Sequence, residues 1–132
     1  MIGIDTNVLV RYIVEDDAEQ AKLATELIEK KCTSQNPAFI NLMVLCELTW
    51  VLIYSYKCQK EEIKQVLQNL LLTENFHVEY HSIAWQAFYD YENGNYDYSD
   101  CLISRLNSEH ECEITWTFDK KASKLNSFQL LK

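Results

Sequence analysis

The sequence contains one proline and two glycines among 132 residues. Linkers and low-complexity segments are usually rich in such residues, so we expect little unstructured connection. No apolar run is long enough to span a membrane, because charges such as Glu47 and Glu79 interrupt the runs. The N-terminal segment lacks the basic region of a signal peptide, and no internal repeat is present. We therefore expect a single domain over residues 1–132, with no membrane contact.

No C-x-x-C pair occurs among the five cysteines. An odd number of scattered cysteines without a secretion signal indicates reduced thiols and predicts a cytoplasmic protein. Cys46 and Cys101 lie in helical apolar runs, where a thiol packs as a small hydrophobic side chain. A zinc site is therefore not expected.

Positive charge is scarce, with 12 Lys and Arg against 20 Asp and Glu, for a formal net charge of −8. Affinity for nucleic-acid phosphates comes from Lys and Arg, so the composition argues against non-specific nucleic-acid binding. If the substrate is a nucleic acid, the acidic groups need a cation beside them. A divalent metal bound by clustered carboxylates would supply that cation.

Hydrophobic residues make up 48% of the chain, enough for a substantial core, and their spacing predicts alternating strands and helices. Because strands alternate with helices, we expect an α/β fold around a mostly parallel sheet. The expected strands are 1–5, 37–41, 76–80, 113–118 and 127–131. The first expected helix begins near Thr6. The other expected helices cover about 18–30, 42–56, 60–72, 82–93 and 98–109.

Four residues carry helix-capping signals. Thr6 and Asn7 are expected to cap the first helix, and Asn41 the helix that follows it. Gly94 is expected to close the helix at 82–93 in the C′ role.

Acidic residues fall at the ends of the predicted strands. Asp5 ends the first strand, and Asp119 ends the strand at 113–118. In an open α/β sheet, ligand sites form beyond the carboxyl ends of the strands. Asp97 and Asp100 begin a helix, and helix N-termini in such folds face the same edge. We therefore expect these four carboxylates at one edge of the sheet.

Glu47 is the fifth acidic candidate and lies within the apolar helix 42–56. A carboxylate in so apolar a run is difficult to explain as solvated surface, so we expect a partner or a metal. Each acid also has a purely structural alternative. Asp5 and Asp97 could be helix caps, Asp97 and Asp100 could form a variant capping box, Asp119 could begin a turn, and Glu47 could project into water.

Carboxylates that converge repel one another unless a cation lies among them. Hard oxygen ligands suit Mg²⁺ or Mn²⁺, and Mg²⁺ commonly works with phosphates. The chemistry predicted from these acids is metal-assisted hydrolysis of a phosphodiester, with a carboxylate orienting or deprotonating the attacking water.

Four segments resemble the motifs of PIN domains, in the right order along the whole chain. They are "MIGIDTNVLVRYIVEDD", "LCELTWVL", "YDYSDCLIS" and "TFDKKASKL". The resemblance is closest to the VapC-type toxins of prokaryotic type II toxin–antitoxin systems. The segment before "DYSD" departs from the family pattern because it is rich in Tyr and Asn.

The resemblance implies a three-layer α/β/α sandwich and a Mg²⁺- or Mn²⁺-dependent endoribonuclease. It also implies an RNA substrate, neutralisation by a cognate antitoxin protein and a homodimer. The implied metal ligands are Asp5, Glu47, Asp100 and Asp119. Asp97 corresponds to an additional catalytic aspartate, and Thr6 with Asn7 to a polar pair that can hold a metal-bound water, so Thr6 is assigned to catalysis and Asn7 to substrate binding.

The cations nearest these motifs are Arg11, Arg105, Lys120 and Lys121. We expect Arg11, Arg105 and Lys120 to bind RNA phosphates. The alternative is that the two arginines only balance neighbouring acids. Tyr91, Tyr96 and Tyr98 could stack on bases, although packing in the core or at its rim is the stronger expectation.

Three other functions would use part of this pattern of residues. A phosphotransferase of the haloacid-dehalogenase type needs D-x-D, but residue 7 is Asn. A response-regulator receiver needs an acid pair near the first strand, whereas the acids at 15–17 follow a helix. The third is a non-catalytic PIN-like module for protein interaction or RNA binding, against which the complete set of acids argues.

Overall fold

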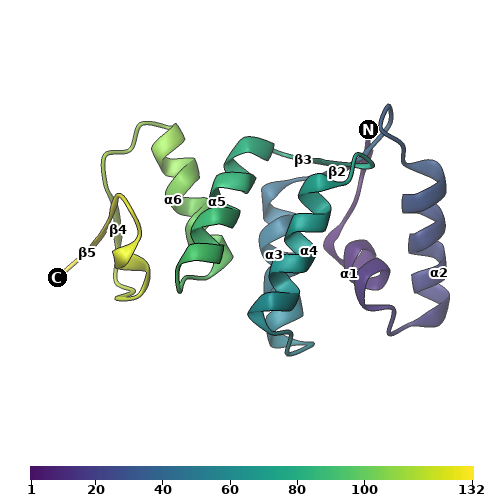
Figure 1. Cartoon of the computed structure of the whole chain (residues 1–132), viewed down its shortest axis with the longest axis horizontal. Helices are drawn as coiled ribbons and strands as arrows, with labels where there is room; N and C mark the ends of the chain where they lie inside the picture. Colours follow the sequence, from purple (N-terminus) through teal and green to yellow (C-terminus); the bar gives the residue numbers. More distant parts are fainter. The chain divides into compact units, whose positions relative to one another are not determined.

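The computed structural model describes residues 1–132, and its contacts divide the chain into two compact units. The first unit is Met1–His81 and the second is Ser82–Lys132. Figure 1 shows the order of the elements along the chain. The expectation of a single domain stays a prediction.

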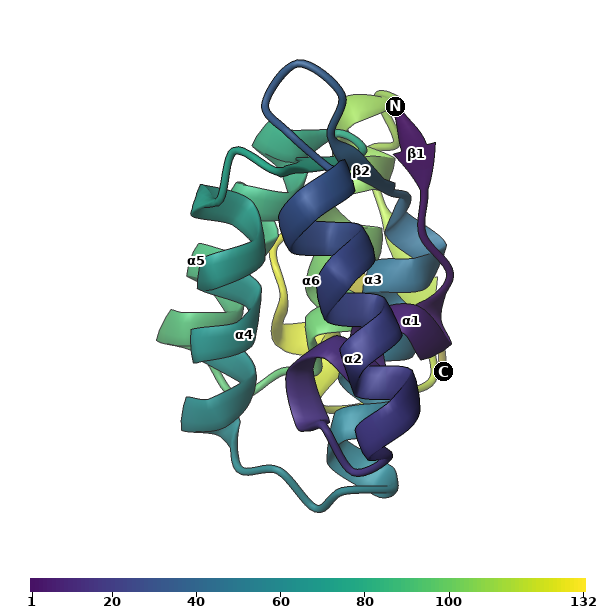
Figure 2. The same ribbon diagram turned by 90° about the vertical axis from the view of Figure 1, so that its right-hand side faces the viewer.

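A three-stranded parallel sheet organises the first unit. It contains β1 (Ile2–Gly3), β2 (Ala38–Ile40) and β3 (Phe76–Val78), in the order β1-β2-β3. Figure 2 shows β1 and β2 side by side. Ala38, Ile40 and Val78 are almost completely buried, so β2 and β3 contribute directly to the core. The three strands predicted in this part of the sequence are confirmed, although each is shorter than expected.

Four helices accompany this sheet, as predicted. They are α1 (Thr6–Val14), α2 (Ala18–Glu26), α3 (Leu42–Tyr54) and α4 (Lys60–Leu72). The predicted helix at 18–30 continues beyond α2 as a π-helical turn, η1 (Leu27–Lys31). α1 packs against both α2 and α3, and Figures 1 and 2 show α1 and α2 beside one another. No helix in the structure has the length and apolar character needed to cross a membrane.

Of the two predictions for the N-terminal caps of α1 and α3, one is confirmed and one is wrong. The side chain of Asn41 accepts a hydrogen bond from the backbone N–H of Val44 at 2.9 Å, so its predicted capping role is confirmed. The prediction that Thr6 and Asn7 cap α1 is wrong. Thr6 is already helical, and the cap is Asp5, whose Oδ1 accepts from the backbone N–H of Thr6 at 2.7 Å.

The second unit contains most of α5 (His81–Asn93), together with α6 (Tyr98–Glu109), β4 (Thr115–Thr117) and β5 (Phe128–Leu130). A short 3₁₀ turn, η2 (Ala122–Lys124), lies between the two strands. β4 and β5 pair in parallel, with Thr115 opposite Phe128. The helices and strands predicted for this region are confirmed. Every strand pair in the chain is therefore parallel, which confirms the expected α/β class with parallel sheets.

The connection between α5 and α6 is built around tyrosine rings. The hydroxyl of the buried Tyr98 donates to the carbonyl of Ala84 at 2.8 Å, and its ring meets that of Tyr91 edge-on at 5.9 Å. The core interpretation of these two tyrosines is confirmed. Gly94 directly follows the last residue of α5, as predicted, but it lacks the left-handed conformation usual for a C′ glycine, because no glycine has a positive φ. Glycine is needed there because the Tyr96 ring occupies the space that a Cβ would fill.

None of the five cysteines forms a disulfide. Cys101 is buried, as expected of a core thiol, whereas Cys46 is half-buried.

Candidate active site

Asp5 lies between the end of β1 and the first turn of α1, as the sequence predicted for an acid ending the first strand. Its Oδ1 caps α1 through the N–H of Thr6, and the side chain remains exposed. The capping alternative is therefore confirmed for Asp5. Since a carboxylate has a second oxygen, the cap leaves Oδ2 available to a ligand.

Thr6 connects α1 to α3 through Glu47. The Thr6 hydroxyl donates to Oε1 of Glu47 at 3.2 Å, and Thr6 itself is 7% exposed. The expectation that Glu47 is not solvated surface is wrong, and the alternative that it projects into water is confirmed, because Glu47 is exposed. Its apolar neighbours along the helix face other directions, since successive residues are turned by roughly 100°. Glu47 has the partner that we expected, a hydroxyl rather than a buried cation.

These side chains surround a cavity of about 400 Å³ in the first unit. Among the residues expected in the site, it brings together the two acids Asp5 and Glu47 with three neighbours from α1. The residues lining the cavity are Asp5, Thr6, Asn7, Val10, Arg11, Glu47, Val51, Ser55 and Tyr56.

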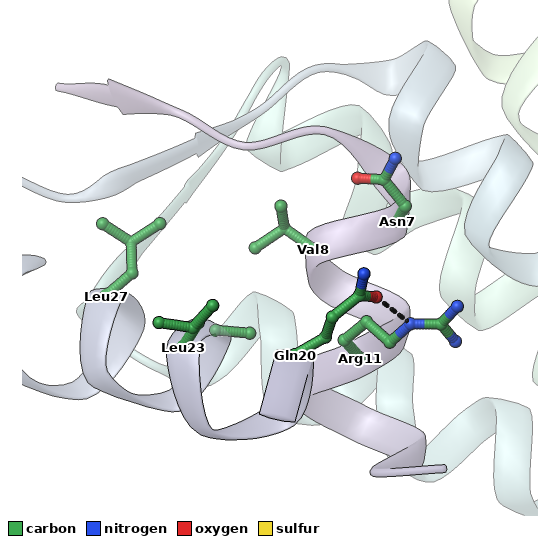
Figure 3. A pocket seen from close by; sticks show the side chains of 7 residues that line it. Asn7, Val8, Arg11, Gln20, Leu23 and Leu27 are labelled. Carbon is green, nitrogen blue, oxygen red and sulfur yellow. Dashed lines mark hydrogen bonds between the residues drawn. The ribbon is translucent and has the colours of Figure 1, made fainter. Parts of the chain in front are cut away.

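Arg11 is held by three side chains that the sequence did not single out. Its Nε donates to Gln20 at 2.6 Å, and its Nη1 donates to Oδ1 of Asp16 at 2.9 Å and to the Tyr56 hydroxyl at 3.3 Å. Tyr56 in turn donates to Oδ2 of Asp16 at 2.7 Å. Figure 3 shows the Arg11–Gln20 bond, with the guanidinium turned away from Leu23 and Leu27.

This network changes the electrostatics of its members. The Tyr56 hydrogen bond, followed by the charge of Arg11, holds the pKa of the Asp16 carboxyl below its usual value against some desolvation. The pKa of Arg11 is raised, chiefly by its hydrogen bond to Tyr56. The ion-pair alternative is thus confirmed as a contact for Arg11, and its predicted role toward RNA stays a prediction.

A second group of acids lies in the second unit, around Asp100. Partial burial raises the pKa of the Asp100 carboxyl, and the charges of Asp97 and Asp119 raise it further, while Lys121 opposes them. The charges of Asp97 and Asp119 therefore both act on the Asp100 carboxyl. The expectation that the acids gather at one edge of a sheet stays a prediction.

Asp97 precedes α6 at the N-cap position, but its side chain makes no capping hydrogen bond. The capping interpretation is therefore confirmed for its position and wrong for its side chain, and no capping box forms with Asp100. The exposed Asp97 carboxylate remains available for other contacts.

Asp119 follows β4 by two residues and organises the next turn. Its Oδ1 accepts from the backbone N–H groups of Lys121 and Ala122 at 2.8 and 3.1 Å. The expectation that it begins a turn is confirmed. The arrangement occupies one carboxylate oxygen and leaves Oδ2 without a hydrogen bond.

Arg105 forms a two-bond ion pair with Asp90 on the neighbouring helix, at 2.7 and 2.9 Å. Its Nε and Nη2 donors are thus engaged, and the alternative that it balances a nearby acid is confirmed as a contact. Lys120 is exposed beside Asp119. Binding of RNA by Arg105 and Lys120 stays a prediction.

No group of three or more His, Cys, Asp or Glu side chains is arranged in the structure as a metal site. The acids of each unit nevertheless fit a hard divalent cation in their chemistry. Asp5, Glu47, Asp97 and Asp119 are exposed, and a cation near the half-buried Asp100 would relieve the repulsion from its like-charged neighbours.

Comparison with known proteins identifies the class. Residues 2–127 match the sequence model of the PIN domain, and the chain belongs to the PIN-domain family. Over 122 residues it is 25% identical to a protein of Aquifex aeolicus (strain VF5) named "VapC ribonuclease", an alignment that covers 92% of this chain and 90% of that protein. The predicted family and its PIN-like α/β/α fold are confirmed.

Proposed function

We propose that the chain is a metal-dependent endoribonuclease, the toxin of a toxin–antitoxin pair. Membership of the PIN family and the similarity to a VapC ribonuclease support this proposal. The observation that carries the proposal is the electrostatic environment of Asp100. The pKa of its carboxyl is raised by burial and by the charges of Asp97 and Asp119. A divalent cation would stabilise the charge of a carboxylate that is disfavoured in this way by burial and by neighbouring carboxylates.

We assign the metal ligands by residue type and motif position to Asp5, Glu47, Asp100 and Asp119. The cation is Mg²⁺ or Mn²⁺, because all four ligands are carboxylates. When bound, such a cation supplies the positive charge that polarises the scissile phosphate.

The remaining roles belong to the chain's own side chains. The Thr6 hydroxyl fixes one oxygen of Glu47 and thereby orients its carboxylate. Asp5 and Asp119 are each held by backbone N–H groups, so their carboxylates are fixed before any ligand arrives. Asp97 is exposed beside Asp100 and is the candidate to accept a proton from the attacking water.

The substrate contacts are assigned to Asn7, Arg11, Arg105 and Lys120. Asn7 and Arg11 line the cavity that contains Asp5 and Glu47. Lys120 follows Asp119 directly. Arg105 would have to share its guanidinium with Asp90, because two of its nitrogens already bind that carboxylate.

The biological setting is proposed on the same similarity. As a toxin, the chain would act in the cytoplasm, form a homodimer and be neutralised by a small antitoxin protein. The gene neighbourhood tests this part separately, because a toxin should lie beside a small open reading frame for its antitoxin.

The activity is tested by incubating the purified protein with total RNA and Mn²⁺ and mapping the cleavage ends. We expect cleavage at defined positions, loss of cleavage in EDTA, and a loss of about 100-fold or more in Asp100→Asn. Cleavage that persists in EDTA would contradict the metal-dependent mechanism. RNA binding without any cleavage would favour the non-catalytic PIN-like module.

A further inference from the structure

We propose that Asp16, Tyr56 and Gln20 are positioning residues that hold the Arg11 guanidinium at the Asp5–Glu47 cavity, where it binds a phosphate of the RNA backbone. This inference rests on the proposed function and adds three residues to it. All the contacts involved lie within the first unit.

The first argument is charge. Asp5 and Glu47 both line the cavity, and Arg11 is the only Lys or Arg that does so. A phosphate approaching two carboxylates is repelled unless a cation compensates, and the whole chain carries a formal charge of −8. Arg11 is therefore the residue of this cavity that can attract a phosphate.

The second argument is the direction of the guanidinium. Nε is engaged by Gln20, and Nη1 by Asp16 and Tyr56, whereas Nη2 makes no hydrogen bond to the protein. Because the guanidinium is planar and rigid, fixing two of its nitrogens also fixes where the third points. In Figure 3 the end of the Arg11 guanidinium points away from Leu23 and Leu27.

The third argument is that stability alone does not explain the network. The side chains of Arg11 and Asp16 are 31% and 42% exposed, and ion pairs with that exposure contribute little to folding. Yet the network joins α1 through Arg11, α2 through Gln20, and the segment after α3 through Tyr56. Since α3 also carries Glu47, the network fixes Arg11 relative to the acidic cavity.

The test exploits a change of sign. Removing the negative charge of Asp16 should strengthen RNA binding if only net charge matters, and weaken it if Asp16 positions Arg11. We would measure the anisotropy of a labelled single-stranded oligoribonucleotide in EDTA, at several KCl concentrations. Asp16→Asn should bind about 3-fold more weakly than wild type, as expected for a misplaced phosphate contact.

Glu15→Gln is the matched control, because it removes the same charge at the neighbouring position. The Glu15 side chain is exposed and makes no hydrogen bond. It should bind as tightly as wild type or more tightly. If Asp16→Asn binds at least as tightly as Glu15→Gln, the positioning role of Asp16 is overturned.

Two further variants, one of them with its own control, keep the proposal open to refutation if Asp16→Asn fails to fold. Tyr56→Phe should weaken binding about 2-fold, whereas Tyr54→Phe, which removes an exposed hydroxyl two residues away, should not. Arg11→Gln should weaken binding about 5-fold and flatten the plot of log K against log salt by about 0.7, the loss of one single-strand phosphate contact.

The outcomes separate this inference from the proposed function. An unchanged salt slope in Arg11→Gln, with wild-type RNA cleavage intact, overturns only the role of Arg11 and its three partners. Equal binding by Tyr56→Phe and Tyr54→Phe removes Tyr56 from the network's function. If the wild-type chain cleaves no RNA with Mn²⁺, the proposed function fails and this inference fails with it.

Discussion

The hydroxyl of Thr6, at the start of α1, donates to the Glu47 carboxylate in the middle of α3 at 3.2 Å. Forty-one positions separate the two residues along the chain. The bond crosses from the helix that Asp5 caps to the helix that carries the second acid of the same cavity. It links the orientation of one proposed ligand to the placement of the other.

Replacing Thr6 by Val tests this link. Val has nearly the same shape but no hydroxyl, so Glu47 should lose its fixed orientation while the packing of the buried side chain is kept. A hydrogen bond to a charged group contributes about 1.5–3 kcal/mol, so RNA cleavage should fall roughly 10- to 100-fold. Thr6→Ser keeps the hydroxyl and should stay within about 3-fold of wild type. Equal activities of the two variants would show that the hydroxyl has no role.

Asp5 serves as a helix cap as well as a proposed ligand, and two substitutions separate these tasks. Asn caps a helix as well as Asp does, so Asp5→Asn should melt within a few degrees of wild type and lose RNA cleavage about 100-fold or more. Asp5→Ala also loses the cap, and should lose about 1 kcal/mol of stability in addition. Thermal unfolding together with the cleavage assay checks both. Retained cleavage in Asp5→Asn would remove Asp5 from the metal site.

The same reasoning applies to Asp119, whose Oδ1 organises the turn before η2. Asn at this position keeps an oxygen for the two backbone N–H groups, so Asp119→Asn should fold normally and lose cleavage about 10-fold or more. Asp119→Ala should also lower the unfolding free energy by roughly 1 kcal/mol. A fully active Asp119→Asn would leave this residue with a structural role only.

The raised pKa of the Asp100 carboxyl should make the stability of the metal-free protein depend on pH. The folded-state pKa of this carboxyl lies above its ordinary value, chiefly because of burial and then because of Asp97 and Asp119. Between those two pKa values the folded state binds more protons than the unfolded state, so stability falls as the pH rises through this window. Above it, the loss is fully present.

Asp100→Asn removes that loss, so at pH 7 in EDTA its melting temperature should exceed that of wild type by on the order of 2 °C. The gain should shrink as the pH falls through the same window. Added Mn²⁺ should stabilise wild type, because it binds only the folded state, and should do so less for the variant. A variant less stable than wild type in EDTA at pH 7 would contradict this account of Asp100.

The roles of Asp97 and Asp100 should be distinguishable by substitution. Because Asp97 raises the pKa of Asp100, the exchange Asp97→Asn should lower that pKa, which a carboxyl-detected NMR titration measures directly. Asp97→Ser should lose only part of the RNA cleavage, about 10-fold, whereas Asp100→Ser should lose nearly all of it. Similar losses in both would show that the two aspartates share one role.

Much of the fold follows from local patterns in the sequence. The helical period at Ile63, Val66, Leu67, Leu70 and Leu71 predicted α4, and all of these side chains are buried except that of Val66, which is half-buried. The short apolar strands were found for the same reason, although "EITWTF" predicted six residues and β4 has three. Strand ends depend on which backbone groups find partners on a neighbouring strand, and the sequence of one segment does not contain that information.

The site was harder to predict where it depends on contacts between distant segments. Glu47 looked buried because its neighbours in the chain are apolar, yet helix geometry turns its side chain toward water. The hydrogen-bond network around Arg11 could not be found from the sequence, since Tyr56 lies 45 positions away and carries no local signal. Asp16 did carry one, as an acid shortly after an arginine, but a nearby opposite charge is too common to identify a pair.

The cap that Asp5 forms with Thr6 bears on how this position can change during evolution. Because Asp, Asn and Ser all cap helices, a descendant that lost its nuclease activity could replace Asp5 by Asn and keep α1 intact. Selection for folding alone would thus keep a small polar residue here, and only selection for catalysis would keep the carboxylate. Asn or Ser at this position in a relative would therefore indicate a protein that has kept the fold and lost the nuclease activity.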